Sequence, residues 1–174
     1  MPQKWSFVHS LFKNRFALFF AVVAVYMALS WLLRMVLLFW SVKDLQFNTL
    51  SVIRTFFNGF VFDLSVSLFF LFIYGIYLLI FPKRWIGSVA DKGITYVYLA
   101  IILFIMFFSL MAEIPFWDEF GVRFNFIAVD YLIYTYEVVT NIHQSYPLPL
   151  IIGTLLALEA LTFLFFKRTG VFRY

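Results

Sequence analysis

Four long apolar runs, separated by short polar segments, dominate the pattern of this chain. They cover residues 16–40, 59–81, 94–112 and 148–166. Each approximates the roughly 20 apolar residues that a helix needs to cross a bilayer core of about 30 Å. None alternates between apolar and polar positions as the strands of a membrane β-barrel do. We therefore predict an all-α integral membrane protein with four transmembrane helices.

The polar segment between the first two spans also has helical spacing. In residues 41–58, apolar positions recur every three or four residues after Asn48 and Thr49, either of which is a suitable N-cap. We predict a short surface helix here that leads into the second span.

The longest polar segment, residues 113–147, is rich in aromatics and holds five of the nine carboxylates. Pro115 is expected to end the third span. Glu119 and Arg123 are four residues apart, the favourable order for a pair on a helix. Apolar positions at helical spacing then predict an interfacial amphipathic helix over residues 127–142.

Composition supports a membrane protein. The chain is 64% hydrophobic and only 13% charged, which is too little charge to cover a soluble surface. The net charge of +4 comes from basic residues clustered beside the apolar runs, so no nucleic-acid partner is expected. The absence of cysteine excludes disulfides and thiolate chemistry.

The distribution of lysine and arginine predicts the orientation. Residues 1–15, 82–93 and 167–174 hold three each, whereas residues 41–58 hold two and residues 113–147 hold one. By the positive-inside rule both ends of the sequence are expected in the cytoplasm. The stretch from 113 to 147 is then external.

Charged residues inside or beside the spans are the candidates for function, because an ionisable group in a bilayer is costly without a partner. Arg34, Asp63 and Glu113 are each expected near the outer end of a span, at one depth. Either Arg34 pairs with Asp63 or snorkels to the headgroups, or the three line a pocket for a lipid headgroup whose phosphate Arg34 binds. Glu159, deeper in the fourth span, is expected to bond another helix, with a proton relay as the alternative.

The predicted headgroup site combines these charges with those of the external stretch: Arg34, Asp63, Glu113, Asp118, Glu119 and Arg123. No catalytic residue and no metal site is predicted. The two histidines, His9 and His143, are expected on opposite sides of the membrane, so they cannot share a metal. We expect no cofactor in this chain.

The run FWDEFGVRFNFIAVDYLIYTYEVVTNIHQSYP, residues 116–147, resembles a segment in the membrane part of bacterial lipoteichoic acid synthase-like and phosphoglycerol transferase proteins, in the form found in Gram-negative bacteria. These proteins belong to the alkaline phosphatase and sulfatase superfamily. The resemblance implies a location in the bacterial cytoplasmic (inner) membrane. It also implies membrane phospholipid as a partner.

Members of this family carry five membrane helices and then an extracytoplasmic sulfatase-like domain with a threonine nucleophile and a divalent metal (Mn, Mg or Zn). None of that domain lies within these 174 residues, so no catalytic residue can be assigned. We expect a fifth span and the catalytic domain to follow in the full-length protein, and that C-terminal domain to be a partner of this one.

The sequence thus predicts the N-terminal membrane module of a sulfatase-superfamily lipid headgroup transferase, which anchors the external domain and binds lipid at the outer leaflet. One alternative is a lipid-sensing regulatory module whose external domain is inactive. A small transporter subunit is another, suggested only by Asp63 and Glu159.

Overall fold

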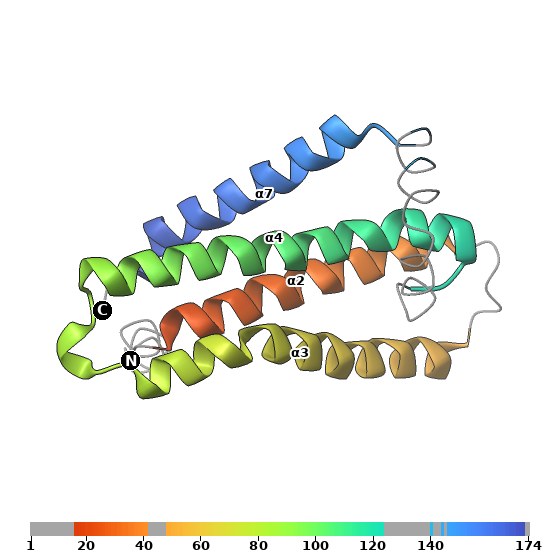
Figure 1. The fold of residues 1–174 in the computed structure, drawn as a ribbon. Helices are drawn as coiled ribbons and strands as arrows, with labels where there is room; N and C mark the ends of the chain where they lie inside the picture. Colours follow the sequence, from red (N-terminus) through yellow and green to blue (C-terminus); the bar gives the residue numbers. More distant parts are fainter. Residues whose placement is uncertain (1–15, 42–47, 124–139, 141–143, 145, 173–174) are drawn as a thin grey trace. The chain divides into compact units, whose positions relative to one another are not determined.

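The computed structural model describes residues 16–41, 48–123, 140, 144 and 146–172, and these residues are helical apart from short turns. Among them there is no strand. The elements are α2 (Ala17–Trp40), α3 (Thr49–Ile80), the short 3-10 helix η1 (Lys83–Trp85), α4 (Val89–Phe120) and α7 (Leu148–Thr169) (Figure 1). All four α-helices are long and apolar enough to cross a membrane. The predicted all-α, multi-pass membrane protein is confirmed.

The chain divides into two compact units. The first comprises Met1–Ile102 with Thr162–Tyr174, and the second comprises Leu103–Leu161. Helices α4 and α7 each contribute one part to each unit.

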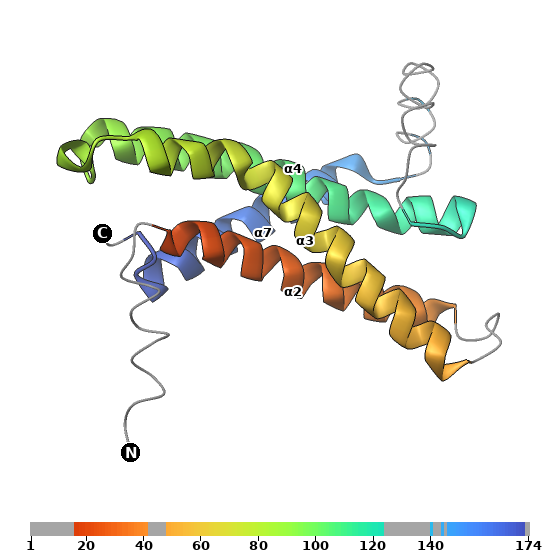
Figure 2. The same cartoon turned by 90° about the horizontal axis from the view of Figure 1, so that it is seen from below.

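In the first unit, α2 and α3 lie side by side and antiparallel in both views (Figures 1 and 2). Their buried residues recur every three or four positions, which places them along one face of each helix. Small residues allow close approach: an added Cβ at Gly75 would touch the Phe19 ring at 3.5 Å. Trp31 also packs edge-on against Phe56. These contacts fix the register of the two helices.

Helix α3 is longer than expected. A surface helix followed by a separate span was predicted, but one continuous helix of 32 residues runs from Thr49 to Ile80, which is about 48 Å at 1.5 Å per residue. Asn48 is the N-cap, and its side-chain oxygen accepts a hydrogen bond from the Leu50 N–H at 3.0 Å. No break occurs at Gly59, the predicted start of the span. The expected Asn48 or Thr49 cap is thereby resolved in favour of Asn48.

Helix α4 extends beyond its predicted limits, 94–112, at both ends. It begins at Val89 because Ser88 acts as a cap, its Oγ accepting from the Asp91 N–H at 3.2 Å. It continues through Pro115 to Phe120, so the expectation that Pro115 ends the span was wrong. Proline removes only one helical hydrogen bond, and membrane helices tolerate that loss.

The end of α4 is set by glycine. Gly121 has φ +63°, a conformation that costs glycine no steric strain, and its N–H bonds the Trp117 carbonyl at 2.8 Å. Gly170 ends α7 in the same way with φ +75°, and the Val171 N–H reaches back to the Phe166 carbonyl. Helix α7 therefore runs three residues past its predicted end at 166.

Most of residues 113–147, including nearly all of the amphipathic helix predicted over residues 127–142, lies outside the described residues.

Candidate functional site

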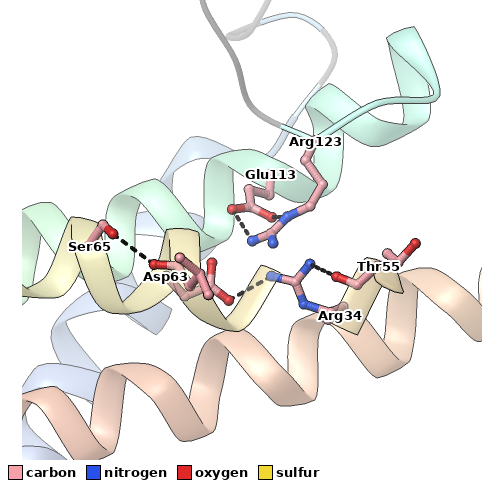
Figure 3. A network of polar contacts seen from close by, with 7 residues as sticks. Arg34, Thr55, Asp63, Ser65, Glu113 and Arg123 are labelled. Carbon is pink, nitrogen blue, oxygen red and sulfur yellow. Dashed lines mark hydrogen bonds and ion pairs between the residues drawn. The ribbon is translucent and has the colours of Figure 1, made fainter. Parts of the chain in front are cut away.

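Arg34 of α2 and Asp63 of α3 form a buried ion pair in the first unit (Figure 3). The Arg34 Nη2 lies 2.6 Å from the Asp63 Oδ2, and both side chains are less than one tenth exposed. The antiparallel register brings the second half of α2 beside the first half of α3. The pairing that the sequence suggested is therefore present.

Gly59 makes room for this pair. Residues 59 and 63 are one turn apart on the face of α3 that meets α2, and the Arg34 guanidinium lies directly against the Gly59 backbone. A Cβ at position 59 would be 1.9 Å from Arg34 Cζ and Nη1. Real Cβ atoms do not approach other atoms so closely. Only glycine at position 59 leaves room for the Arg34 guanidinium.

The same guanidinium also lies near the backbone of α3. Its Nη1 is 3.5 Å from the Thr55 carbonyl oxygen, one turn before Gly59, which is a weak contact (Figure 3). Thr55, Gly59 and Asp63 thus form one row along α3 that accommodates a single arginine. An arginine held by a carboxylate in this way links two helices, because removing either partner would leave a buried charge alone.

The polar face continues along both helices. Ser30 lies one turn from Arg34 on α2, and Ser67 lies one turn from Asp63 on α3; both are fully buried. The Ser67 hydroxyl donates to the Leu64 carbonyl at 2.8 Å. Small polar side chains are typical of close helix contacts in membranes. The ion pair is therefore part of a packed interface between α2 and α3.

Glu113 and Arg123 form a second pair, within the second unit (Figure 3). It is bidentate: the arginine Nε and Nη2 donate to Oε2 and Oε1, each at 2.7 Å. The turn at Gly121 brings the chain back along α4, so that Arg123 meets Glu113 and not the helical neighbour Glu119 that the spacing favoured. The expected helical pair assumed that the helix continued beyond Gly121, and it ends at Phe120.

The two charge pairs lie in different units, so the expected meeting of Arg34, Asp63 and Glu113 at one depth stays a prediction. Asp118 and Glu119 are exposed on the last turn of α4. The Arg123 side chain is 26% exposed, whereas that of Glu113 is 9% exposed. Glu159 is half-buried on α7.

Asp91 is a buried carboxylate whose environment the sequence did not reveal. It accepts hydrogen bonds from the Tyr77 hydroxyl at 2.6 Å and from the Gly87 N–H at 2.8 Å. In the sequence it lies in the basic segment 82–93, beside Lys83, Arg84 and Lys92. The signal that could have been read is the S-x-x-D pattern of residues 88–91, which resembles a capping box and places the acid in the first helical turn.

Within the described ranges, no three His, Cys, Asp or Glu side chains gather in a way that could hold a metal ion. His9 and His143 lie outside those ranges. The described candidate residues instead form charge pairs, Arg34 with Asp63 between α2 and α3, and Arg123 with Glu113 of α4.

No protein-family model, curated protein or solved structure matches this chain.

Proposed function

We propose that this chain is the N-terminal membrane module of a lipid headgroup transferase of the sulfatase superfamily, and that it anchors an extracytoplasmic catalytic domain. The observation that carries the proposal is the resemblance of residues 116–147 to the membrane part of phosphoglycerol transferase-like proteins. The presence of four helices suited to cross a membrane supports it.

The Glu113–Arg123 pair supports the anchoring role. Two charge-assisted hydrogen bonds fasten Arg123, which follows the end of α4, to Glu113 within that helix. A catalytic domain that docks on the 113–147 stretch would then contact a segment that is fixed to a membrane helix. Asp118 and Glu119, exposed beside it, supply charge for such a contact or for a lipid headgroup.

Arg34 and Asp63 have a different role in the proposal. Because the Arg34 guanidinium is buried and already bound to a carboxylate, it holds α2 to α3. With 7% of its side chain exposed, Arg34 offers a phosphate little access. Arg123 is also bound to a carboxylate, that of Glu113, but its side chain is 26% exposed against 7% for Arg34, so within the predicted set it is the better candidate to contact an outer-leaflet phosphate.

The gene supplies the first test. Reading the native open reading frame past codon 174 should reveal a fifth apolar span and then a domain with a candidate threonine nucleophile and Asp, Glu or His metal ligands. A following domain without the threonine and its ligands would favour the regulatory alternative. A stop codon at this point, or a domain of another class, would refute the proposal.

Lipid binding supplies the second test. Anionic phospholipid binding by the purified chain should fall on Arg123→Gln and be retained in the double variant Arg34→Met with Asp63→Leu, which removes both buried charges together. If the double variant loses binding and Arg123→Gln does not, the headgroup site lies at Arg34 after all.

A further inference from the structure

One end of the first unit presents basic side chains and an exposed tryptophan. The turn between α3 and α4 carries Arg84 and Trp85, both exposed, with the Arg84 Cζ 5.8 Å from the centre of the Trp85 ring. Lys92, one turn into α4, is also exposed. A cation above an indole ring at this distance is a favourable contact.

The last turn of α7 adds two further charges to this end. Tyr96 of α4 packs against Phe163 and Phe172, at centroid distances of 6.4 and 5.0 Å, which places the end of α7 beside the beginning of α4. Lys167 lies one turn beyond Phe163, in the direction of the turn between α3 and α4. Figures 1 and 2 agree that this turn and the end of α7 lie at the same end of the unit.

No acidic side chain offsets these charges in residues 81–93 and 162–172. Asp91 is the single acid there, and its carboxylate points inward to the Tyr77 hydroxyl and the Gly87 N–H; only 4% of the residue is exposed. Both signs of charge occur in residues 82–93, but Arg84 and Lys92 are exposed whereas Asp91 is buried, so the surface here is basic. We call Arg84, Trp85, Lys92, Lys167 and Arg168 the basic patch.

We propose that the basic patch binds the anionic phospholipid headgroups of the membrane leaflet at this end of the protein. Its position at the ends of α3, α4 and α7, which are suited to span a bilayer, places the charges where headgroups begin. Tryptophan favours that same layer. Clustered basic residues beside membrane helices attract anionic lipids by charge. The inference does not depend on the proposed transferase role.

The test compares lipid selectivity in vesicles. The full chain is reconstituted in phosphatidylcholine, and spin-labelled phosphatidylglycerol and phosphatidylcholine are compared for their relative association with the protein. The unaltered chain should prefer the anionic lipid, and the preference should weaken as salt is raised. Replacing Arg84, Lys92, Lys167 and Arg168 by glutamine should lower this preference strongly, with Arg123 left in place.

Arg54 offers a matched control. It is exposed on the first turns of α3, at the opposite end of that helix from η1 and the basic patch, and Arg54→Gln removes the same charge as Arg84→Gln. Arg84→Gln should lower the selectivity by about fivefold at low salt, from about 1 kcal/mol per basic residue, and Arg54→Gln should lower it much less. Equal losses in the two variants would overturn the assignment to the patch.

A soluble competitor separates a bilayer headgroup from a free phosphate. Millimolar glycerol phosphate should leave the selectivity unchanged at matched ionic strength, because the patch gathers charge over a surface and encloses no single ligand. Full competition by glycerol phosphate, or an unchanged preference in the fourfold variant, would refute the proposal. Melting of each variant in detergent checks that the exposed substitutions leave the fold intact.

Discussion

At the residue scale, the buried charge of Arg34 depends on the missing side chain of Gly59. Arg34 is buried beside Asp63 only because position 59, one turn away on the same face of α3, has no Cβ. Neither the ion pair nor the glycine is understandable alone. An arginine in this interface needs both the carboxylate and the space.

Gly59→Ala should therefore destabilise the chain, although alanine is the better helix former. The new methyl group would overlap the Arg34 guanidinium, and such overpacking typically costs about 1–3 kcal/mol. Thermal unfolding in mild detergent would measure the loss.

Gly75→Ala is the matched control in the same helix. There the added Cβ would make only ordinary contact with the Phe19 ring, at 3.5 Å. We expect unchanged or slightly higher stability, by up to about 1 kcal/mol from helix propensity. An equal loss in both variants would show that α3 does not tolerate any side chain at its glycines, and that the Arg34 contact is not the cause.

Replacing one partner of the ion pair should destabilise the protein more than replacing both partners. Asp63→Leu leaves the Arg34 charge buried without its carboxylate, and Arg34→Met does the reverse; each should cost about 3–5 kcal/mol. The double variant Arg34→Met with Asp63→Leu should recover most of that loss. Unfolding of the four proteins completes a double-mutant cycle, and additive losses would contradict a direct coupling.

At the element scale, helix ends are set by caps and glycines. Asn48 and Ser88 begin α3 and α4 by accepting backbone hydrogen bonds, and Gly121 and Gly170 end α4 and α7 with positive φ. Proline is the stronger helix breaker by residue type, yet α4 continues through Pro115 to Phe120 and ends at the glycine turn.

Ser88→Ala should loosen the beginning of α4. The Asp91 N–H would lose its acceptor, which for a capping serine costs about 0.5–2 kcal/mol. Ser65→Ala is the control, since the Ser65 hydroxyl donates to the Val61 carbonyl within the helix and caps nothing. Hydrogen exchange of the first turns of α4 should rise in the first variant alone, and equal exchange would contradict the capping role.

At the scale of the whole molecule, the chain is a multi-pass membrane protein made of two units that share α4 and α7. Its orientation is still a prediction from the positive-inside rule. The absence of native cysteine makes that prediction easy to test, since any introduced cysteine is the single labelling site.

Val122→Cys, just after α4, should react in intact cells with a membrane-impermeant thiol reagent. Val89→Cys, at the other end of the same helix, should react only after permeabilisation. Both valines are exposed, at 41% and 90%, so a difference in labelling reports the side of the membrane. The reverse pattern would place both ends of the chain outside and would refute the predicted topology.

The sequence predicted the helical class and the approximate spans, and it named Arg34 and Asp63 as candidate partners. It missed Gly59, since one glycine within an apolar run gives no sign of what lies opposite. It also paired Arg123 with Glu119, because spacing assumes an unbroken helix and the glycine turn instead brings Arg123 to Glu113.

Hydropathy is a local property, so the sequence by itself determined that this protein has four apolar segments suited to cross a membrane. Which charged side chains pair with each other depends on the register between helices and on turns that reverse the chain. Only the tertiary structure decided that Arg34 rests on Gly59 and that Asp91 turns inward from the basic patch. Both involve contacts between different helices, Arg34 of α2 with Gly59 of α3 and Asp91 of α4 with Tyr77 of α3, which hydropathy alone does not specify.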